Sequence, residues 1–382
     1  MRRNFQDANK KMYLKIEKIS VERLFGFLNY DIELPESEHV VITGPNGYGK
    51  TMLLKLTHNA ISNNYEELAK INFGTFELFT NFGRVRYLNT SSGLQIESFL
   101  HDSKKIITHS TQQKSEERVF DDTRACSILI HSVHLNDESE TFSIIARQRE
   151  LLEERMKSTQ AKLNKLDQLA VDLFSSISEK TQVIQNNQLP EMFQQRVVGL
   201  QDRLKPYSQF GLLPKSSKYL ELSDLGFVLD HTINLREKLD EIFYEVSLHE
   251  DFVGRLVMFS ELIAKKKFSF KTLTINPDFG FAFFNHVGAN IPLNKLSSGE
   301  KNQVSIFFDL IFKAENGATI LIDEPEVSLH ISWQRDLLNE FSLISKFNHY
   351  SQLIVTTHSP DVIGDEWESS VDLFDKHVIC KE

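Results

Sequence analysis

Buried strands and amphipathic helices leave different hydrophobic patterns, and both occur along this 382-residue chain. Apolar and polar residues alternate in two early segments, 12–17 and 30–34, which predicts two strands. An apolar run at 40–43 predicts a third strand, so the first half of an α/β layer is in place early. A mixed β lobe is expected beyond it, from three short segments: 83–88, 94–99 and 127–133.

The pattern becomes helical and charge-rich between about 141 and 184, where apolar residues fall at the a and d positions of a heptad repeat. A second stretch, 235–256, carries the same spacing. We expect two long helices around a broken middle, either as a protruding coiled coil or as a local bundle. The predicted helix breakers are Pro190, Pro206, Gly211 and Pro214.

The core pattern resumes after this helical region. Strands are predicted at 268–275 and 281–285, then at 319–324 and 353–357, with an amphipathic helix at 304–312. One α/β core with a large helical insertion explains this order of elements. The predicted domains are residues 1–140 (first half of the core), 141–266 (insertion) and 267–382 (second half).

A glycine-rich loop directly follows the strand at 40–43. Its sequence, Gly-Pro-Asn-Gly-Tyr-Gly-Lys-Thr at 44–51, fits G-x-x-x-x-G-K-[ST] at every fixed position, and a helix-compatible run follows at 52–56. Backbone N–H groups of such a loop curl around phosphates, and the helix N-terminus adds a positive field. A plain turn is the alternative. The predicted ATP ligands are Asn46, Gly47, Gly49, Lys50 and Thr51, and Thr51 is also a predicted Mg²⁺ ligand.

Two adjacent carboxylates end the apolar strand at 319–324. Strands of an α/β sheet present their carboxyl ends to the nucleotide, so Asp323 is predicted to hold Mg²⁺ through water. Glu324 points the other way and is predicted to polarise the water that attacks the γ-phosphate. His358 follows the last strand and is predicted to sense the γ-phosphate at the same sheet edge.

Composition narrows the class of protein. The net charge of −10 excludes a globally basic nucleic-acid binder, and Lys265–Lys267, the tight basic run, is interpreted as a solvated helix end. Cys126 and Cys380 build no disulfide framework, which suits a reducing cytosol. There is no apolar run of membrane-spanning length and no signal-peptide pattern, so a cytoplasmic protein is expected.

One histidine pair, His131 and His134, is a weak metal-site candidate. It has no cysteine or carboxylate partner set nearby in sequence, and in a strand the two side chains would face opposite sides. We therefore expect no metal site at this pair.

Taken together, the motifs resemble those of ABC-type ATPases. Walker A corresponds to 44–51, the signature motif to 296–300, Walker B to 320–324, and the switch histidine to His358. The segments 323–330, 333–334 and 357–360 look like the SMC/RecF-like branch, especially ATPases similar to overcoming-lysogenisation-defect (OLD) proteins. The resemblance covers 12–60 and 268–380, and does not extend to the insertion.

The resemblance implies an α/β fold: an ABC-type P-loop ATPase head with a mixed β lobe and a long helical insertion. It implies a head-to-tail homodimer, or higher oligomer, that sandwiches ATP and Mg²⁺ between heads. Ser297 and Gly299 of the opposite subunit would close over the γ-phosphate, and 327–329 resembles the D-loop. Ser298 stands where transporter signatures have glycine. Gln95 is the candidate Q-loop glutamine, in competition with Gln112 and Gln113.

Three functions share this motif set. A transporter's nucleotide-binding subunit is the first, but such subunits are compact and lack long heptad-bearing helices. A RecF-like DNA-repair ATPase that clamps DNA is the main alternative. We favour the ATPase subunit of a bacterial anti-phage defence system, similar to Septu, PARIS or retron-associated types, with slow, dimerisation-dependent hydrolysis. OLD-like proteins often continue into a nuclease, whereas this chain ends soon after His358, so a separate nuclease or toxin effector is expected.

Overall fold

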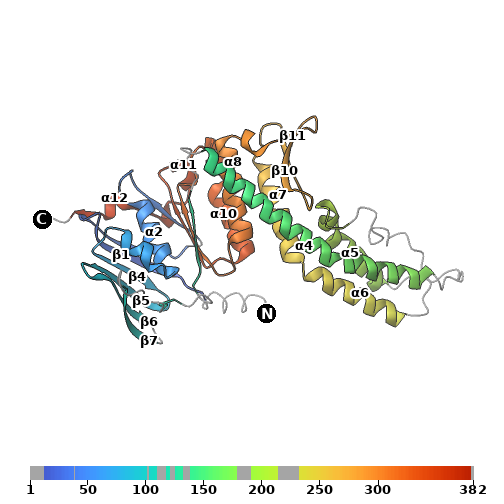
Figure 1. Cartoon of the computed structure of the whole chain (residues 1–382), viewed down its shortest axis with the longest axis horizontal. Coiled ribbons are helices and arrows are strands. Elements are labelled where there is room, and N and C mark those ends of the chain that lie inside the picture. Colours follow the sequence, from blue (N-terminus) through green and yellow to red (C-terminus); the bar gives the residue numbers. More distant parts are fainter. Residues whose placement is uncertain are drawn as a thin grey trace. The chain divides into compact units, whose positions relative to one another are not determined.

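The computed structural model describes residues 13–37, 39–100, 103–109, 118–120, 125–131, 138–178, 191–213 and 232–379. The chain forms two compact units (Figure 1): a head unit, Met1–Asp137 with Ser298–Glu382, and a helical unit, Glu138–Ser297. Six residues considered in the sequence analysis lie outside the described residues: Gln112, Gln113, His134, Pro190, Pro214 and Cys380.

A five-stranded sheet forms the centre of the head unit. Its order is β14-β3-β13-β12-β8, and every neighbouring pair is parallel. β3, β12 and β13 are buried along their whole length, which is why the sequence shows continuous apolar runs there. The strands are β14 (Ser370–Asp372), β3 (His39–Thr43), β13 (Gln352–Thr356), β12 (Thr319–Asp323) and β8 (Ser127–His131).

A seven-stranded antiparallel sheet lies beside it in the head unit, in the order β15-β2-β1-β4-β5-β6-β7. β5 and β6 alternate between buried and partly exposed positions, the pattern of strands with one covered face. β4 was missed by the sequence analysis. The strands are β15 (Val378–Ile379), β2 (Leu28–Glu33), β1 (Ile16–Leu24), β4 (Thr75–Thr80), β5 (Gly83–Thr90), β6 (Gly93–Leu100) and β7 (Ser103–His109).

Helix α2 (Lys50–Ile61) packs between the two sheets. Leu53, Leu54 and Leu56 belong to one buried cluster with Ile19 of the antiparallel sheet and Leu321 of the parallel sheet. This cluster fixes the N-terminus of α2 at the carboxyl edge of the parallel sheet. The other head helices are α3 (Tyr65–Lys70), α8 (Ser298–Phe308), α9 (Ile331–Gln334), α10 (Leu337–Asn348), α11 (Pro360–Ile363) and α12 (Leu373–Lys376), with single turns or short segments η3 (Asp309–Lys313) and η4 (Trp367–Ser369).

The helical unit is built around one long helix, α4 (Glu138–Ser178), seen as the green helix in Figure 1. Its buried residues Leu152, Met156 and Leu163 are those predicted at heptad positions. The second predicted helix is in fact two, because Leu248 and His249 form a turn between them. These are α6 (Thr232–Ser247) and α7 (Glu250–Lys265).

One of the predicted helix breakers in the middle of the insertion, Pro206, does not end a helix. Helix α5 (Glu191–Gln209) continues through Pro206, which lies near its C-terminal end. Proline lacks an N–H group and usually ends a helix. Here Leu204 and Tyr207 are buried on either side of it, and the Phe210 N–H donates to the Pro206 carbonyl at 3.0 Å. Packing on both sides therefore carries the helix past the proline.

A three-stranded antiparallel sheet, in the order β11-β10-β9, also belongs to the helical unit. The unit is thus longer than the insertion expected from the sequence, because this sheet packs on α4. A Cβ atom at Gly280 would lie 2.3 Å from the Arg149 carbonyl oxygen, so only glycine permits this approach. The strands are β9 (Lys271–Asn276), β10 (Gly280–Asn285) and β11 (Asn290–Ile291), followed by the turn η2 (Leu293–Lys295).

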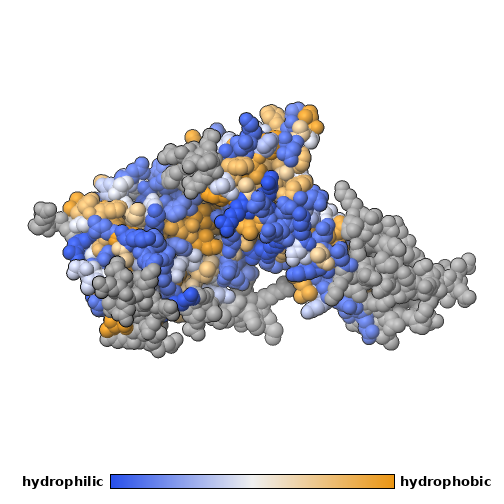
Figure 2. All heavy atoms as spheres, in the orientation of Figure 1, coloured by the Kyte–Doolittle hydropathy of each residue, from blue (hydrophilic) through white to orange (hydrophobic). Residues whose placement is uncertain are grey.

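Figure 2 shows hydrophobic residues gathered over β10 and β11 on the visible face of the helical unit. The exposed apolar side chains of this sheet region include Phe270 and Val287, with 82% and 72% of their surface accessible. Within the described part of the chain, no helix combines the length and the apolar character needed to cross a membrane.

Candidate nucleotide site

The P-loop connects β3 to α2 and has the backbone shape that its glycines predict. Gly49 has a φ of +81°, a backbone conformation that favours glycine. A Cβ atom at this position would also lie 2.8 Å from a methyl carbon of Leu24. The buried Lys50 Nζ donates to the Gly44 carbonyl at 2.8 Å and to the Pro45 carbonyl at 3.3 Å. The lysine charge is thus held inside the curve of the loop.

Asp323, the last residue of β12, is buried and receives two hydroxyl hydrogen bonds. Thr51 Oγ1 donates to Oδ2 at 2.8 Å, and Thr356 Oγ1 donates to Oδ1 at 2.6 Å. Burial alone would raise the pKa of Asp323, but hydrogen bonds from His131, Thr356 and Thr51 outweigh it, so the pKa lies below its ordinary value. The carboxylate is therefore ionised at neutral pH.

Glu324 lies between a lysine and a histidine. Its Oε1 lies 3.6 Å from Lys50 Nζ and 3.6 Å from His358 Nδ1. Its φ of +47° is unusual for a non-glycine residue before a proline. The Glu324 N–H donates to the Thr356 carbonyl at 3.0 Å, which helps to hold the strained backbone. The Glu324 carboxylate thus lies beside the lysine and the histidine.

Glu326 orients His358, and the sequence analysis gave it no role of its own. Its Oε1 accepts hydrogen bonds from Thr357 Oγ1 at 2.6 Å and from the His358 N–H at 3.0 Å. The same oxygen lies 3.2 Å from His358 Nδ1. Glu326 is 4% exposed, whereas 49% of the His358 side chain is accessible. A buried carboxylate thus fixes the base of a histidine whose ring remains open to solvent.

The predicted signature glycine, Gly299, has a contact within its own chain. A Cβ atom there would lie 2.5 Å from the carbonyl oxygen of Ser328, in the predicted D-loop. Asn302, one turn later in α8, donates through Nδ2 to the Pro325 carbonyl at 3.2 Å and to the Val327 carbonyl at 3.1 Å. Helix α8 therefore supports the loop that follows Glu324.

Two predicted ligands are not brought to this cluster by the described contacts. Gln95 lies in β6, in the antiparallel sheet, and its Nε2 is 3.4 Å from Glu97 Oε1. Two strands, β4 and β5, separate β6 from β1. The assignment of Gln95 as the Q-loop glutamine therefore gains no support and stays a prediction. Ser297 ends the helical unit directly before α8 and is exposed. Its action across a dimer also stays a prediction.

His131 corrects the expectation that it has no carboxylate partner. Its Nδ1 lies 3.4 Å from Asp323 Oδ2, on the neighbouring strand. The two residues are far apart in sequence, so their proximity depends on the pairing of β8 with β12, in which they are register partners. Only the sheet order reveals this contact.

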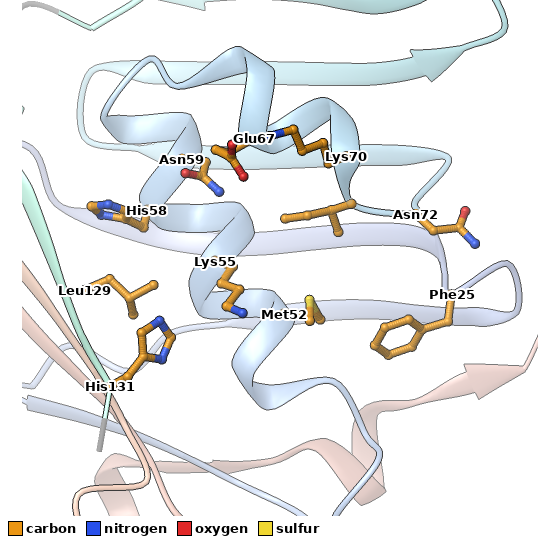
Figure 3. A pocket seen from close by; sticks show the side chains of 11 residues that line it. Phe25, Met52, Lys55, His58, Asn59, Glu67, Lys70, Asn72, Leu129 and His131 are labelled. Atoms are coloured by element: carbon orange, nitrogen blue, oxygen red, sulfur yellow. Dashed lines mark hydrogen bonds and ion pairs between the residues drawn. The ribbon is translucent and has the colours of Figure 1, made fainter. Parts of the chain in front are cut away.

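A pocket of about 490 Å³ opens along one face of α2, next to the P-loop (Figure 3). Phe25 and Met52 line one part with apolar surface, and His58 and His131 lie in another part. Asparagine side chains can hydrogen-bond the edge of a base, and aromatic rings can stack on it. The lining residues are Phe25, Met52, Lys55, His58, Asn59, Glu67, Lys70, Ile71, Asn72, Leu129 and His131.

The donor set fits a nucleotide with a divalent cation. Lys50 and the N-terminus of α2 suit phosphate oxygens, and the hydroxyl of Thr51 beside the ionised Asp323 suits Mg²⁺, a cation that prefers oxygen ligands. When bound, the cation would neutralise phosphate charge. Among the described residues, no cluster of three or more histidine, cysteine or carboxylate side chains could hold a metal by itself.

A parallel sheet, a P-loop that leads into a buried helix, and two carboxylates at the end of the neighbouring strand define a P-loop ATPase. The fold class predicted from the sequence, a mixed α/β ABC-like head with a helical insertion, is confirmed. Residues 40–364 match the family described as "AAA domain, putative AbiEii toxin, Type IV TA system". The match spans most of the chain, and the protein belongs to this family.

Among curated proteins, none matches the sequence significantly. Solved structures with a similar chain trace include a "Smc head domain with an extended coiled coil bound to the C-terminal domain of ScpA" from Pyrococcus furiosus, at 16% identity and a TM-score of 0.43, covering 96% of both chains. Another is the "SmcHead bound to the C-winged helix domain of ScpA", at 12% identity and a TM-score of 0.38, covering 92% of this chain and 91% of that one.

Proposed function

We propose that this protein binds and hydrolyses ATP with Mg²⁺ and acts as the sensor or regulatory subunit of a prokaryotic anti-phage defence complex. The observation that carries the ATPase assignment is the convergence of Lys50 and His358 on one oxygen of Glu324. A carboxylate between a phosphate-binding lysine and an exposed histidine stands where a water molecule that attacks phosphate needs a base.

Each polar group then has a distinct task. Lys50 and the P-loop N–H groups bind the phosphate oxygens. Thr51 and Asp323 hold the cation, and Glu324 accepts a proton from the attacking water. His358 lies within reach of Glu324 and can report whether the terminal phosphate is present, because Glu326 fixes its backbone and its Nδ1 side. The pocket beside α2 takes the nucleoside, with Phe25 as the stacking surface.

The proposed dimer is supported by the exposure of Ser297. Ser297 is exposed and can reach a second subunit, whereas Gly299 is packed against Ser328 of its own chain. Substitution of Gly299 would therefore disturb the loop behind it. Ser297→Arg is the cleaner test of a role across the dimer interface.

Defence is favoured over DNA repair by two observations. The family description names a putative toxin of a type IV toxin–antitoxin system and no repair function. The basic run at Lys265–Lys267 is not a continuous cationic surface, because Lys266 is only 3% exposed. A RecF-like clamp needs several exposed cations along phosphate groups.

The biochemical test compares ATP hydrolysis and solution mass in wild type and two variants. Lys50→Ala is expected to weaken nucleotide binding, and Glu324→Gln to keep binding while blocking turnover. In light scattering with ATP and Mg²⁺, Glu324→Gln should show a nucleotide-dependent increase in mass that Ser297→Arg abolishes when added to it. Turnover by Glu324→Gln at the wild-type rate would show that the base is misassigned.

The biological test separates the two functions. Cells that carry this gene with its native neighbours are challenged with phages in one assay and with ultraviolet light in another. Defence predicts a lower plating efficiency of phage, lost in Lys50→Ala and after disruption of a neighbouring effector gene. A repair ATPase would instead change survival after irradiation and leave phage plating unaltered.

A further inference from the structure

His131 is the residue of this site that the ATPase assignment leaves unexplained. It ends β8, and its register partner across the parallel pair is Asp323. Register partners on parallel neighbouring strands point to the same face of a sheet, so the imidazole and the carboxylate leave the sheet side by side. The distance between His131 Nδ1 and Asp323 Oδ2 is 3.4 Å.

The imidazole faces the same carboxylate oxygen as the hydroxyl of the P-loop. Thr51 Oγ1 donates to Asp323 Oδ2 at 2.8 Å, so three elements, α2, β12 and β8, each bring one donor atom to this point. The Asp323 side chain is 4% exposed, whereas 41% of the His131 side chain is accessible. The histidine therefore stands at the open side of the cluster, where a bound cation can reach it.

The kinds of donor decide which cation suits the cluster. Hydroxyl, carboxylate and phosphate oxygens suit Mg²⁺, which usually takes oxygen ligands only. An imidazole nitrogen is a poor ligand for Mg²⁺, whereas first-row transition metals accept it, and among these Mn²⁺ is the cation that also suits carboxylate and water oxygens. One imidazole among several oxygen donors therefore moves the preference of a site towards Mn²⁺.

We propose that His131 supplies a nitrogen ligand to the divalent cation that accompanies the nucleotide, and that the site prefers Mn²⁺ to Mg²⁺. This proposal rests on the proposed binding of ATP, because the cluster supplies one donor atom each from Thr51, Asp323 and His131, and phosphate oxygens would supply the others. It also explains why a histidine ends a strand of otherwise small or apolar residues.

His58, the other histidine of this pocket, has a different partner (Figure 3). It lies on α2, and its Nδ1 is 3.0 Å from Ser127 Oγ, at the opposite end of β8 from His131. Both histidines line the pocket, but only His131 is the register partner of Asp323. Lys55 also lines the pocket, and its positive charge suits phosphate oxygens rather than the cation.

The test uses the full chain with Mn²⁺ and a non-hydrolysable ATP analogue, and reads pulsed electron paramagnetic resonance of the metal. Couplings to ³¹P report that the metal sits on nucleotide phosphate, and couplings to ¹⁴N report a bound imidazole. Wild type should show both. His131→Gln should keep the ³¹P couplings, lose the ¹⁴N couplings and bind Mn²⁺ about ten-fold more weakly. The control, His286→Gln, changes an exposed histidine of the helical unit and should match wild type.

Labelling the protein with ¹⁵N-histidine should convert the nitrogen signal to that of ¹⁵N, which identifies imidazole as its source. Calorimetry with Mg²⁺ in place of Mn²⁺ should show a smaller effect of His131→Gln. Wild-type protein with ³¹P couplings but without histidine couplings would overturn the ligand role of His131 and leave the ATPase assignment standing. Failure of the analogue to bind in calorimetry would overturn both proposals.

Discussion

The two units bury different kinds of side chain. In the head unit, polar groups lie buried at the ends of strands and bond to one another, as Asp323 does with Thr356 and Glu326 with Thr357. In the helical unit, the buried positions are mainly apolar and follow a helical repeat, as at Leu152, Met156, Leu163, Leu239 and Leu256.

This difference indicates which buried residues serve the reaction and which mainly stabilise the fold. Burying a polar group costs free energy unless it is paired, so a network of buried carboxylates and hydroxyls indicates a function. Apolar burial stabilises a fold without specifying a reaction. Substitutions in the head unit should therefore change turnover and its pH dependence, and substitutions in the helical unit should change mainly the free energy of unfolding.

The largest expected effect is that of Glu324→Gln on hydrolysis. Loss of the general base should lower kcat at least about 100-fold, while the affinity for nucleotide changes little. Phosphate release at saturating ATP and binding of a fluorescent analogue measure the two quantities. Glu368→Gln, at an exposed position of the same unit, should hydrolyse ATP like wild type. An equal loss of kcat in both variants would contradict the special role of Glu324 in the cluster.

The next effect is that of Leu256→Ala on stability. Leu256 is fully buried in α7, so truncation should lower the free energy of unfolding by about 3 kcal/mol, through lost contacts and a cavity. Urea unfolding followed by circular dichroism measures the change, and kcat is measured well below the melting temperature. Leu248→Ala, at a position that is 55% exposed, is the control. A fall in kcat for Leu256→Ala as large as that for Glu324→Gln would contradict the expected difference between the two units.

A smaller effect, with a distinct pH dependence, is expected for Thr356→Val. The variant leaves Asp323 Oδ1 without its hydroxyl donor, which should cost about 2 kcal/mol. Because the pKa of Asp323 is lowered in the folded protein, its ionised form contributes stability above the unfolded-state pKa of about 4. That contribution disappears as the pH falls through the folded-state pKa. The difference between wild type and variant should therefore be largest near neutral pH and shrink in acid.

Thr57→Val is the control for this pH dependence. Thr57 is equally buried in the head unit, but its hydroxyl donates to the Leu53 carbonyl, a group that does not ionise, at 2.8 Å. Its loss of stability should be independent of pH between pH 4 and 8. A pH-independent effect of Thr356→Val would contradict the part assigned to its hydroxyl.

The smallest effect is that of Tyr30→Phe. The Tyr30 hydroxyl donates to the carbonyl of Tyr48 in the P-loop at 2.7 Å, so its removal should cost about 1 kcal/mol of stability. Burial, with a smaller effect of Tyr48, raises the pKa of Tyr30 to about 12. The neutral phenol thus contributes stability below pH 10 that is lost as the pH rises through about 12.

Difference absorbance at 295 nm measures this titration. The variant should lack one tyrosinate transition near pH 12 that the wild-type protein shows. A transition at the ordinary pH for Tyr30 would show that the P-loop is not held by this hydroxyl.

The sequence predicted the elements with strong local signals. The P-loop, the strands that precede Gly44 and end at Asp323, and the long helix α4 were found, because continuous apolar runs and heptads are read from neighbouring residues. β4 and α5 were missed. Pro206 breaks the local helix pattern, and only the burial of residues around it shows that the helix continues.

Five site residues were also predicted and lie together: Lys50, Thr51, Asp323, Glu324 and His358. Their motifs are short and have fixed spacing. Gln95 was proposed only from its place after the P-loop helix, and the structure puts it in the antiparallel sheet. Spacing along the chain does not say which of two sheets a strand joins.

The sequence by itself therefore determined the class of protein, the phosphate loop and the carboxylates, because each of these depends on residues that are close in the chain. The tertiary structure alone decided that β8 lies beside β12, that His131 meets Asp323, and that Glu326 fixes His358. The order of strands in a sheet results from packing and hydrogen bonding between distant segments. No local sequence pattern predicts this order, so the contact between His131 and Asp323 could be found only in the folded chain.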